Sequence, residues 1–343
     1  ANVAQRLELT QKLSQLGEKR ERLGSILGSS DVMQVVYTTI ESLASSRATA
    51  LITGESGTGK ELAARAIHDL SVRAPKEFVA VNCAAIPSDL IESELFGEAS
   101  GVRGNVRARD GLIKQSDGGT LFLDEVCDMP YELQSVLLRF IQSGSFKPVG
   151  SDNEFVADVR ILAATNRDPL FEMREGRLRE DLFYRLHVVP LRVPPLRERG
   201  DDVLLLSTYY LKVFSEQEAR ETCGFSEDAR REFRRYPWPG NVRQLENIIH
   251  RLVLMSPEQT IGYEQLRVAI MDSDMVDSTA SNPSAITPLT SEARVGGVEP
   301  LWLTEKRAIQ SAIDHCEGNV NRAAGLLEVA PSTIYRKIQS WKS

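Results

Sequence analysis

The sequence predicts an α/β fold with a parallel sheet, followed by helical segments and a small all-α domain. Three observations predict this arrangement. Short apolar segments alternate with helical patterns between residues 31 and 195, a glycine-rich loop follows one of these segments, and only helical patterns come after residue 196. Apolar strands joined by helices indicate a parallel sheet that is covered on both faces.

The composition sets limits on the class of protein. The 343 residues are 42% hydrophobic and 26% charged, and at about 150 residues per domain this length suggests two or three globular domains. The sequence has no apolar run long enough for a transmembrane helix and no secretory signal, and its four cysteines are scattered, so we expect a cytoplasmic protein without membrane association. The net charge of −7 argues against a generic polyanion binder. Residues 301–343, however, carry an excess of Lys and Arg, which places any nucleic-acid role at the C-terminal end.

The expected elements begin with an amphipathic linker helix over residues 1–25, where Leu9, Leu13, Leu16 and Leu23 form a heptad-like stripe. Residues 196–271 look purely helical. Residues 272–299 are rich in Ser, Thr, Pro, Gly and Ala and are expected to be a flexible linker, and residues 300–343 resume a helical pattern. Within residues 26–195 the expected strands are Thr49–Thr53, Phe78–Asn82, Thr120–Asp124, Arg160–Thr165 and Val188–Leu191.

The strongest candidate site is the loop Gly54-Glu55-Ser56-Gly57-Thr58-Gly59-Lys60-Glu61, which lies between an expected strand and a helical pattern. Glycines let backbone N–H groups turn toward phosphates, and the N-terminus of the following helix adds positive potential. Lys60 would reach the β- and γ-phosphates of a nucleotide. The Ser or Thr that usually follows the lysine is replaced by Glu61; the alternative is a glycine-rich turn that binds nothing.

A second candidate is the acidic pair Asp124 and Glu125, which follows the apolar segment Thr120–Leu123. Ligands of open α/β sheets bind at the carboxyl ends of the strands, where this pair would lie. Asp124 would hold Mg²⁺, directly or through water, and Glu125 would polarise the attacking water. Most Asp-Glu pairs are simply solvated, but this one follows a phosphate loop and a buried strand.

Residues 26–271 resemble the AAA+ domain of bacterial enhancer-binding proteins, the activators that work with sigma-54 RNA polymerase. The matching segments are GESGTGKELAARAIH (54–68), VNCAAIP (81–87), ESELFGE (92–98), DGGTLFLDEVCDMP (117–130), LLRFIQSGSFKPVGS (137–151), VRILAATNRD (159–168), LREDLFYRLHVVPLRVPPLRERGDD (178–202) and WPGNVRQLENII (238–249). The resemblance implies an AAA+ α/β subdomain over 26–195 and a helical lid over 196–271, with ATP or ADP and Mg²⁺ bound. The family also carries Glu at the position of Glu61.

The resemblance implies a role for each matching position. Asn82 matches the residue that restrains the catalytic glutamate, and Thr165 and Asn166 match the first sensor of the nucleotide. Arg179 and Arg185 match the arginine fingers that reach the γ-phosphate on the neighbouring subunit. A cation supplied in trans stabilises the charge of the transition state, so fingers imply an oligomeric ring.

The implied nucleotide-binding set also includes Arg243, which matches the second sensor in the lid. In full it comprises Gly54, Glu55, Ser56, Gly57, Thr58, Gly59, Lys60, Glu61, Asp124, Thr165, Asn166 and Arg243. ATP binding is therefore expected, and the sequence leaves open whether ATP is hydrolysed.

The segment Glu98–Val106 departs from the family. Members that remodel sigma-54 carry a Gly-Ala-Phe-Thr-Gly-Ala loop here, whose Phe and Thr touch the sigma factor. In this sequence neither residue is present, and Arg103 stands near the place of the aromatic residue. Because a guanidinium group inserted into a partner must be desolvated, this loop argues against sigma-54 remodelling.

Some relatives with degenerate loops work instead with the housekeeping holoenzyme. Biofilm regulators of the VpsR type, which respond to cyclic di-GMP, and aromatic-amino-acid regulators of the TyrR type are examples. The VpsR type is the expected match, with cyclic di-GMP as its implied ligand. The layout of the family also implies a receiver-like domain before residues 1–25, as in two-component systems.

Residues 300–343 resemble the Fis-type helix-turn-helix domain of enhancer-binding proteins. Ala323 and Ala324 would allow two helices to cross closely, and Ile334, Ile338 and Trp341 would pack inward from the second helix. The opposite face would enter the major groove of palindromic upstream DNA. Its expected DNA-binding residues are Ser332, Thr333, Arg336, for a base, and Lys337, for a phosphate.

We compare three candidate functions with these patterns. The first is a DNA-binding transcription activator that binds ATP and acts through a holoenzyme other than sigma-54. The second is an ATP-hydrolysing hexameric sigma-54 activator that remodels the closed promoter complex. The third, a P-loop enzyme that phosphorylates a small molecule, gains no support from the finger arginines or the basic C-terminal helix. A dimer in solution would favour the first function over the second.

Overall fold

The computed structural model describes residues 19–100, 108–220, 224–255 and 260–280, together with residues 309, 312, 316, 319–327, 329 and 334. They fall into two compact units, Ala1–Ser281 and Asn282–Ser343, each of which is described by itself.

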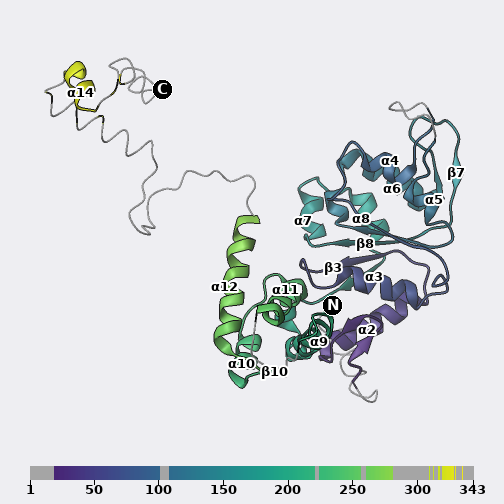
Figure 1. Ribbon diagram of the computed structural model, residues 1–343. Coiled ribbons are helices and arrows are strands. Elements are labelled where there is room, and N and C mark those ends of the chain that lie inside the picture. Colours follow the sequence, from purple (N-terminus) through teal and green to yellow (C-terminus); the bar gives the residue numbers. More distant parts are fainter. Residues whose placement is uncertain are drawn as a thin grey trace. The chain divides into compact units, whose positions relative to one another are not determined.

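A five-stranded parallel sheet forms the centre of the first unit (Figure 1). The predicted α/β class is confirmed, and each strand begins and ends within one residue of its predicted bounds. The central strand is buried along its whole length, whereas Pro190 stands in an edge strand, where a missing backbone donor is tolerated. The order across the sheet is β4 (Phe78–Asn82), β5 (Thr120–Asp124), β8 (Arg160–Thr165), β3 (Ala50–Thr53) and β9 (Val189–Arg192).

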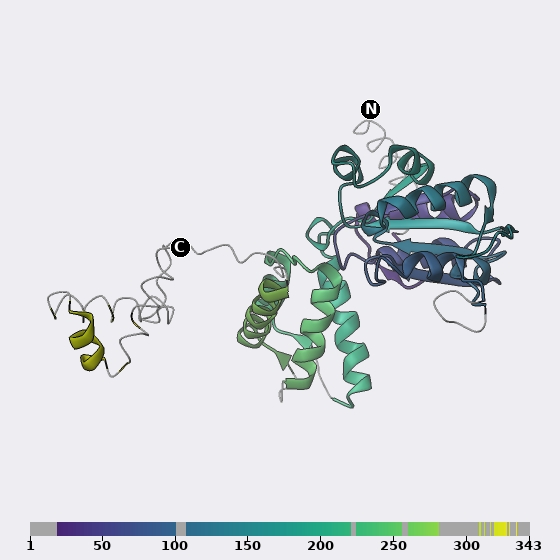
Figure 2. The same ribbon diagram turned by 90° about the horizontal axis from the view of Figure 1, so that it is seen from above.

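Helices cover both faces of this sheet (Figure 2). Because successive side chains of a strand point to opposite faces, Leu121 and Leu123 join one apolar core and Phe122 joins the other. The first core includes residues of α4 (Ile91–Phe96), α5 (Leu112–Gln115), α6 (Tyr131–Ser143) and α8 (Glu180–Leu186). The second includes residues of α2 (Asp31–Ala44) and α3 (Lys60–Asp69).

The lid is a helical subdomain with its own core around the buried Trp238. It consists of η3 (Leu196–Glu198), α9 (Asp202–Gln217), α10 (Glu227–Arg235), α11 (Asn241–Met255) and α12 (Tyr263–Ala280), with a short parallel pair formed by β10 (Gly224–Phe225) and β11 (Thr260–Ile261). Two predictions are corrected here. Residues 196–271 are not purely helical, because this strand pair ties together the segments that precede α10 and α12.

The helix α12 also continues through residues 272–280, which were predicted to belong to the linker. The sequence of α12 contains neither Gly nor Pro, and the first proline after it is Pro283, so nothing in the chain breaks the helix before Ala280.

The N-terminal segment forms a hairpin where a helix was predicted. Leu23 lies in β1 (Arg22–Leu23), which pairs antiparallel with β2 (Ile26–Leu27) around Gly24 at φ +58°. A positive φ is easy only for glycine, which explains the turn. The other leucines of the predicted stripe, Leu9, Leu13 and Leu16, lie outside the described residues.

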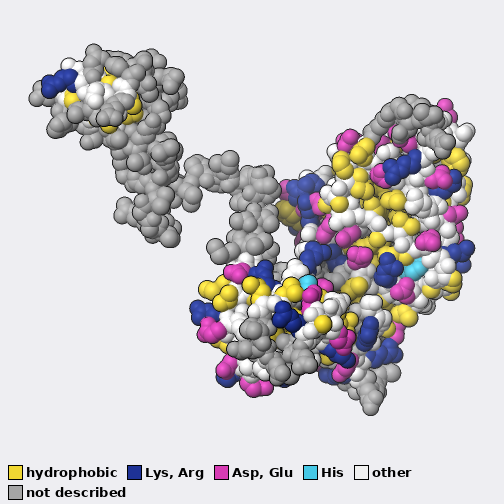
Figure 3. Space-filling view, in the orientation of Figure 1, with side chains coloured by type: hydrophobic (Ala, Val, Ile, Leu, Met, Phe, Trp, Pro, Cys, Tyr) yellow, Lys and Arg dark blue, Asp and Glu magenta, His cyan; other side chains and the backbone are white. Residues whose placement is uncertain are grey.

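The remaining elements of the first unit are short. They are η2 (Val126–Asp128), the pair β6 (Ser145–Phe146) and β7 (Phe155–Val156), and α7 (Pro169–Arg174), whose first turn is capped by the Asp168 carboxylate. Within the ranges that the structure describes, no helix is both long and apolar enough to cross a membrane. On the face of this unit seen in Figure 3, Lys and Arg side chains alternate with Asp and Glu.

In the second unit, α14 (Val320–Leu326) is the described helix with assigned bounds. Its Ala323 and Ala324 are fully buried, and Ala324 shares a small core with Ile309 and Ile334. The small side chains thus face inward, as the predicted close helix crossing requires, and Ile334 is buried as predicted. Ile338 and Trp341 lie outside the described residues.

The first prediction concerns the central strand. Leu162→Ala removes a fully buried side chain of β8 and should lower the free energy of unfolding by about 2–5 kcal/mol through lost burial and the cavity that remains. Leu170→Ala, on the half-exposed surface of α7, should cost less than about 1 kcal/mol. Chemical denaturation followed by circular dichroism measures both. Equal costs would contradict the placement of β8 at the centre of the core.

Candidate nucleotide site

The phosphate loop joins β3 to α3 at the carboxyl edge of the sheet. Gly57 and Gly59 have φ angles of +74° and +96°, which only glycine adopts without strain, and α3 begins at Lys60. A Cβ on Gly57 would lie 2.4 Å from the carbonyl oxygen of Gly240 in the lid, so glycine is also required by close packing. The loop thus presents backbone N–H groups and a helix N-terminus, as an anion site requires.

Lys60 and Glu125 meet beneath this loop. The Lys60 Nζ donates to the carbonyl oxygen of Gly54 at 3.1 Å and lies 3.5 Å from Glu125 Oε1. Both side chains are largely buried, with 7% and 14% of their surface exposed. A buried ammonium beside a carboxylate and a phosphate loop is an arrangement in which a phosphate can draw the lysine toward itself.

The strand β5 places the two predicted carboxylates at the same edge. Asp124 ends the strand, and its Oδ1 accepts a hydrogen bond from the Glu125 N–H at 3.1 Å. Glu125 has φ +51°, a conformation that costs a non-glycine residue free energy and that is found mostly at functional sites. This backbone turn aims the Glu125 side chain at Lys60.

One of the two predicted sensor residues, Asn166, contacts the same carboxylate. The Asn166 N–H donates to Glu125 Oε2 at 2.9 Å, and Thr165 Oγ1 accepts from the Arg167 N–H at 3.1 Å. Asn82 lies opposite Asp124 in the β4–β5 register, but its Oδ1 accepts from the Ala84 N–H. Among the described residues, therefore, Glu125 forms an ion pair with Lys60 and accepts a hydrogen bond from Asn166, and no hydrogen bond joins it to Asn82.

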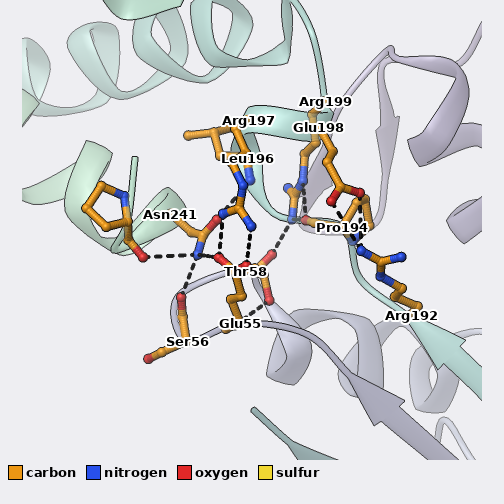
Figure 4. Close-up of polar contacts among 11 residues, drawn as sticks. Glu55, Ser56, Thr58, Arg192, Pro194, Leu196, Arg197, Glu198, Arg199 and Asn241 are labelled. Carbon is orange, nitrogen blue, oxygen red and sulfur yellow. Dashed lines mark hydrogen bonds and ion pairs between the residues drawn. The ribbon is translucent and has the colours of Figure 1, made fainter. Parts of the chain in front are cut away.

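The lid holds the phosphate loop through Glu55 (Figure 4). The Arg197 guanidinium donates to both carboxylate oxygens of Glu55, with Nη1 to Oε2 at 2.7 Å, and the Asn241 Nδ2 donates to Oε2 at 3.2 Å and to the Ser56 carbonyl at 3.0 Å. Asn241 is fully buried at φ +52°, a conformation that Asn tolerates better than most residues. The hydrogen bonds that Glu55 accepts from Arg197, and to a smaller extent that from Asn241, lower its pKa below the ordinary value of 4.5.

Arg199 supports the loop from below. Only 2% of its surface is exposed, and its Nη2 donates to the carbonyl oxygens of Thr58 at 2.6 Å and Pro194 at 2.8 Å. Burial lowers the pKa of Arg199 to about 10, which leaves the group charged at neutral pH. The buried Asp202 nearby accepts hydrogen bonds from the backbone of Ser29 and Ser30, so the N-terminal segment is tied to the first turn of α9.

An apolar hollow lies beside Thr58 and Gly59, between the hairpin, α3 and the lid. Its apolar side chains offer the kind of surface that a heterocyclic base contacts, but at about 40 Å³ the hollow must widen to admit one. Tyr210 contributes one wall, and burial raises the pKa of its hydroxyl to about 12, so this group is neutral at physiological pH. The apolar lining includes Ile26, Leu27, Val36, Leu62, Val193, Leu206 and Val242.

The remaining predicted residues divide into two groups. Arg243 lies beside the loop, with Nη1 3.5 Å from Ser56 Oγ, and Glu61 is exposed on the first turn of α3. Arg179 and Arg185 both belong to the α8 region: Arg179 makes two hydrogen bonds to Asp181 at 3.1 and 2.9 Å, and Arg185 is exposed. The structure therefore brings Arg243 to the loop, while the two other arginines are presented elsewhere on the surface.

Two predicted sites fall outside the described residues. Residues 101–107, which include Arg103, cover most of the segment that departs from the sigma-54-contact loop. The predicted DNA contacts Ser332, Thr333, Arg336 and Lys337 are also outside.

Sequence reasoning missed Arg197, Arg199 and Asn241 as residues of the site. All three lie in segments that matched the family, LRER at 196–199 and WPGN at 238–241, but the letters alone do not reveal that both segments fold back on Glu55 and Thr58. The positive φ of Asn241 is a signal that a turn pattern of Pro, Gly and Asn could have supplied.

Comparison with protein families divides the chain in the same order. Residues 26–192 match the family described as "Sigma-54 interaction domain", residues 197–283 match "AAA+ ATPase lid domain", and residues 300–341 match "Bacterial regulatory protein, Fis family".

Individual proteins are similar over nearly the whole chain. The luminescence regulatory protein LuxO of Vibrio campbellii is 51% identical over 92% of this chain and 69% of its own length. The DNA-binding transcriptional regulator NtrC of Rhizobium meliloti is 41% identical over 92% and 69%. Among solved structures, NtrX from Brucella abortus in complex with ATP has a TM-score of 0.66 at 33% identity, and the match covers 97% of this chain and 72% of that one.

The second prediction tests the pairing of Glu55 with Arg197. A double-mutant cycle with Glu55→Gln and Arg197→Gln should give a coupling free energy of about 0.5–1 kcal/mol in thermal unfolding at low salt, because both groups are more than a third exposed. The lowered pKa of Glu55 means that the coupling is present at pH 7 and is lost as the pH falls below 4.5 through the folded-state pKa. The cycle for Arg139 and Glu154, an exposed pair 3.3 Å apart that lies away from the loop, serves as the control. Coupling that is independent of pH and salt would refute the pairing.

Proposed function

Because the chain belongs to the NtrC-like family of bacterial enhancer-binding proteins, we propose that it binds ATP between its phosphate loop and lid and so controls how its C-terminal helices act on DNA. In its class the chain is a DNA-binding AAA+ regulator of the sigma-54-activator type. The observation that carries the proposal is the convergence of Lys60, Glu125 and Asn166 beneath a glycine-rich loop.

ATP would bind along the carboxyl edge of the sheet. Its phosphates would lie on the loop Gly54–Gly59 and the first turn of α3, with Lys60 turned from Glu125 toward the β- and γ-phosphates. The base would lie at the apolar hollow between the hairpin and the lid, which would have to widen around it. Arg243 would add a positive charge from the lid. NtrX, crystallised with ATP and with ADP, supports nucleotide binding by this fold.

Mg²⁺ fits the carboxylate chemistry at the end of β5. Within the described residues no three His, Cys, Asp or Glu side chains cluster as a ready-made metal site. Mg²⁺ in nucleotide sites is held by one or two carboxylates together with phosphate oxygens and water, so a single Asp124 suffices. The ion would supply charge neutralisation at the phosphates, while the protein positions Asp124 and Glu125 toward it.

Hydrolysis would use Glu125 as the group that accepts a proton from the attacking water. Its strained backbone, its ion pair with Lys60 and its hydrogen bond from Asn166 hold the carboxylate in a defined place. Asn82 ends the adjacent strand, from which its side-chain amide would donate a hydrogen bond to Glu125 in place of these partners. Arg179 and Arg185, presented on the surface of α8, would act on the nucleotide of a neighbouring subunit. This assignment requires a homo-oligomer, with a hexameric ring as the state that hydrolyses ATP.

The partner polymerase follows from the loop that lacks Phe and Thr. The segment Glu98–Val106 contains neither Phe nor Thr and carries Arg103 near the place of the aromatic residue. Because inserting a guanidinium group into a partner requires its desolvation, we propose activation through a different holoenzyme, with the AAA+ fold acting as a nucleotide-gated scaffold. The second candidate, a hexameric sigma-54 remodeller, is favoured by the complete set of Lys60, Asp124, Glu125 and finger arginines, and by the family match of residues 26–192.

Several finer assignments stay predictions. They are the cyclic di-GMP input, a receiver-like domain before the linker segment, palindromic DNA sites read by Ser332, Thr333, Arg336 and Lys337, a location in the cytoplasm, and the domain divisions at residues 25, 195 and 299. The buried Ala323, Ala324 and Ile334 support the helix-turn-helix that would carry these DNA contacts.

The third prediction separates nucleotide binding from turnover. Lys60→Ala should weaken ATP binding about 10–100-fold by removing a charged hydrogen bond to phosphate, whereas Glu125→Gln should keep binding and lower kcat about 10²–10⁴-fold. Calorimetry and a phosphate-release assay measure the two effects, and Glu132→Gln, an exposed change on α6, should alter neither. The same proteins are then assayed in transcription with each holoenzyme.

The transcription assay decides between the two candidates. Activation of the housekeeping holoenzyme that depends on Lys60 and tolerates Glu125→Gln supports the scaffold. Open complexes with sigma-54 holoenzyme that vanish with Glu125→Gln would establish the remodeller and refute the scaffold. A wild-type chain that fails to bind ATP would refute both.

The fourth prediction tests the fingers in trans. Arg179→Ala and Glu125→Gln should each be inactive alone as ATPases. Mixed in equal amounts, they should regain about a quarter of wild-type turnover, because a site with intact Glu125 meets a neighbour with intact Arg179 in about one contact of four. If the mixture stays inactive while both variants still assemble, as measured by light scattering, Arg179 does not act between subunits.

A further inference from the structure

A second hollow, which we call the amino-edge hollow, lies at the amino ends of β3, β8 and β9. It has a volume of about 400 Å³, and three arginines line it: Arg47 precedes β3, Arg160 opens β8, and Arg185 precedes β9. The phosphate loop follows the opposite end of β3, which is about 13 Å away at the rise of a parallel strand. The chain's own nucleotide site therefore cannot account for this cluster.

Arg160 is a buried cation with unused donors. Only 3% of its surface is exposed, its Nη2 donates to the Leu43 carbonyl at 2.7 Å, and within the described residues its Nε and Nη1 have no hydrogen-bond partner. Burial, and secondarily the positive charge of Arg73, lowers the pKa of Arg160 from its ordinary value. A buried charge is costly unless an opposite charge lies near it.

Asp158 also lines the hollow, but its carboxylate does not neutralise Arg160. Asp158 Oδ1 accepts from the Arg73 Nη2 at 2.6 Å, and Arg73 Nη1 also donates to the Asp158 carbonyl at 2.7 Å. Asp158 is thus already matched by a fourth arginine. The charges of Arg47, Arg160 and Arg185 leave the hollow with a positive excess.

We propose that the amino-edge hollow binds a phosphate-bearing anion. Guanidinium groups suit the tetrahedral oxygens of phosphate because each offers several donors in a fixed fork. Arg47 and Arg185 are exposed and can contact the anion directly, while Arg160 supplies positive charge from beneath. The hollow is large enough for two linked phosphoryl groups.

Two sources can supply this chemistry. One is a free phosphate compound in solution. The other is the nucleotide of a second copy of the chain, which would approach Arg185 in a ring; this source rests on the proposed function. In the second case Arg47 and Arg160 would be positioning residues that strengthen the finger.

The experiment uses inorganic pyrophosphate as the probe and the full chain with Lys60→Ala, so that the phosphate loop contributes little. Pyrophosphate at about ten times its Kd should raise the Tm of this protein by roughly 3–5 °C. Adding Arg47→Ala should abolish the rise, and Arg47→Lys should retain part of it. Arg47 is exposed, so neither change should disturb folding. Adding Arg231→Ala instead, an exposed change on the lid, should leave the rise intact.

A second measurement distinguishes the sources. If the phosphate comes from a second copy, Arg47→Ala in the otherwise wild-type chain should lower kcat at least about tenfold, with KM for ATP unchanged, only at concentrations where the ring forms. The anion is a free compound if the Tm shift with pyrophosphate is independent of protein concentration and Arg47→Ala leaves kcat unchanged. The proposal is overturned when Arg47→Ala changes neither the pyrophosphate shift nor kcat. If the wild-type chain has no ATPase activity, the Tm shift with pyrophosphate alone decides whether the hollow binds an anion.

Discussion

The close approach of the phosphate loop to the lid is the constraint on which the site depends. The Gly57 carbonyl accepts from the Val242 N–H at 2.9 Å, and a Cβ on Gly57 would lie 2.4 Å from the Gly240 oxygen. Backbone therefore meets backbone, with no side chain between them. The lid cannot move by rotamer changes alone, and a displacement of α11 must break or carry along the loop that would hold the phosphates.

The ionic contacts around this backbone contact differ in how readily they can change. Arg199 is buried and donates to main-chain carbonyls of the loop and of the segment before η3, so it fixes the two together. Glu55 and Arg197 are partly exposed, and their pairing is worth little in free energy. Rearranging the exposed pair when a nucleotide alters the loop therefore costs little free energy, while Arg199 keeps the loop attached to the segment before η3. A lid that responds to bound nucleotide needs both kinds of contact.

The sheet and the main residues of the nucleotide site could be predicted from the sequence. The five strands follow from apolar runs, and the loop glycines and the Asp124–Glu125 pair follow from chemistry that permits few alternatives. The predicted sensor Asn166 was placed from resemblance, and its contact with Glu125 through a backbone N–H could not have been read from its side chain. The helical prediction at Leu23 failed because a stripe of leucines does not register that Gly24 turns the chain into a hairpin, and the short β10–β11 pair depends on tertiary contact rather than on local pattern.

The buried cations at the two edges of the sheet differ in whether a carboxylate lies beside them. At the carboxyl edge Lys60 has a carboxylate partner 3.5 Å away, so the charge is balanced before a phosphate arrives and the lysine must exchange one partner for another. At the amino edge the hydrogen-bond partner of Arg160 within the described part of the chain is the Leu43 carbonyl, and further arginines line the same hollow. Exchange of one partner for another avoids leaving a buried charge unpaired, whereas an unbalanced buried cation favours an anion that reaches it. In a chain with a net charge of −7, such local positive excess is not a consequence of composition. It arises from where the topology places the residues that open β8 and precede β3 and β9.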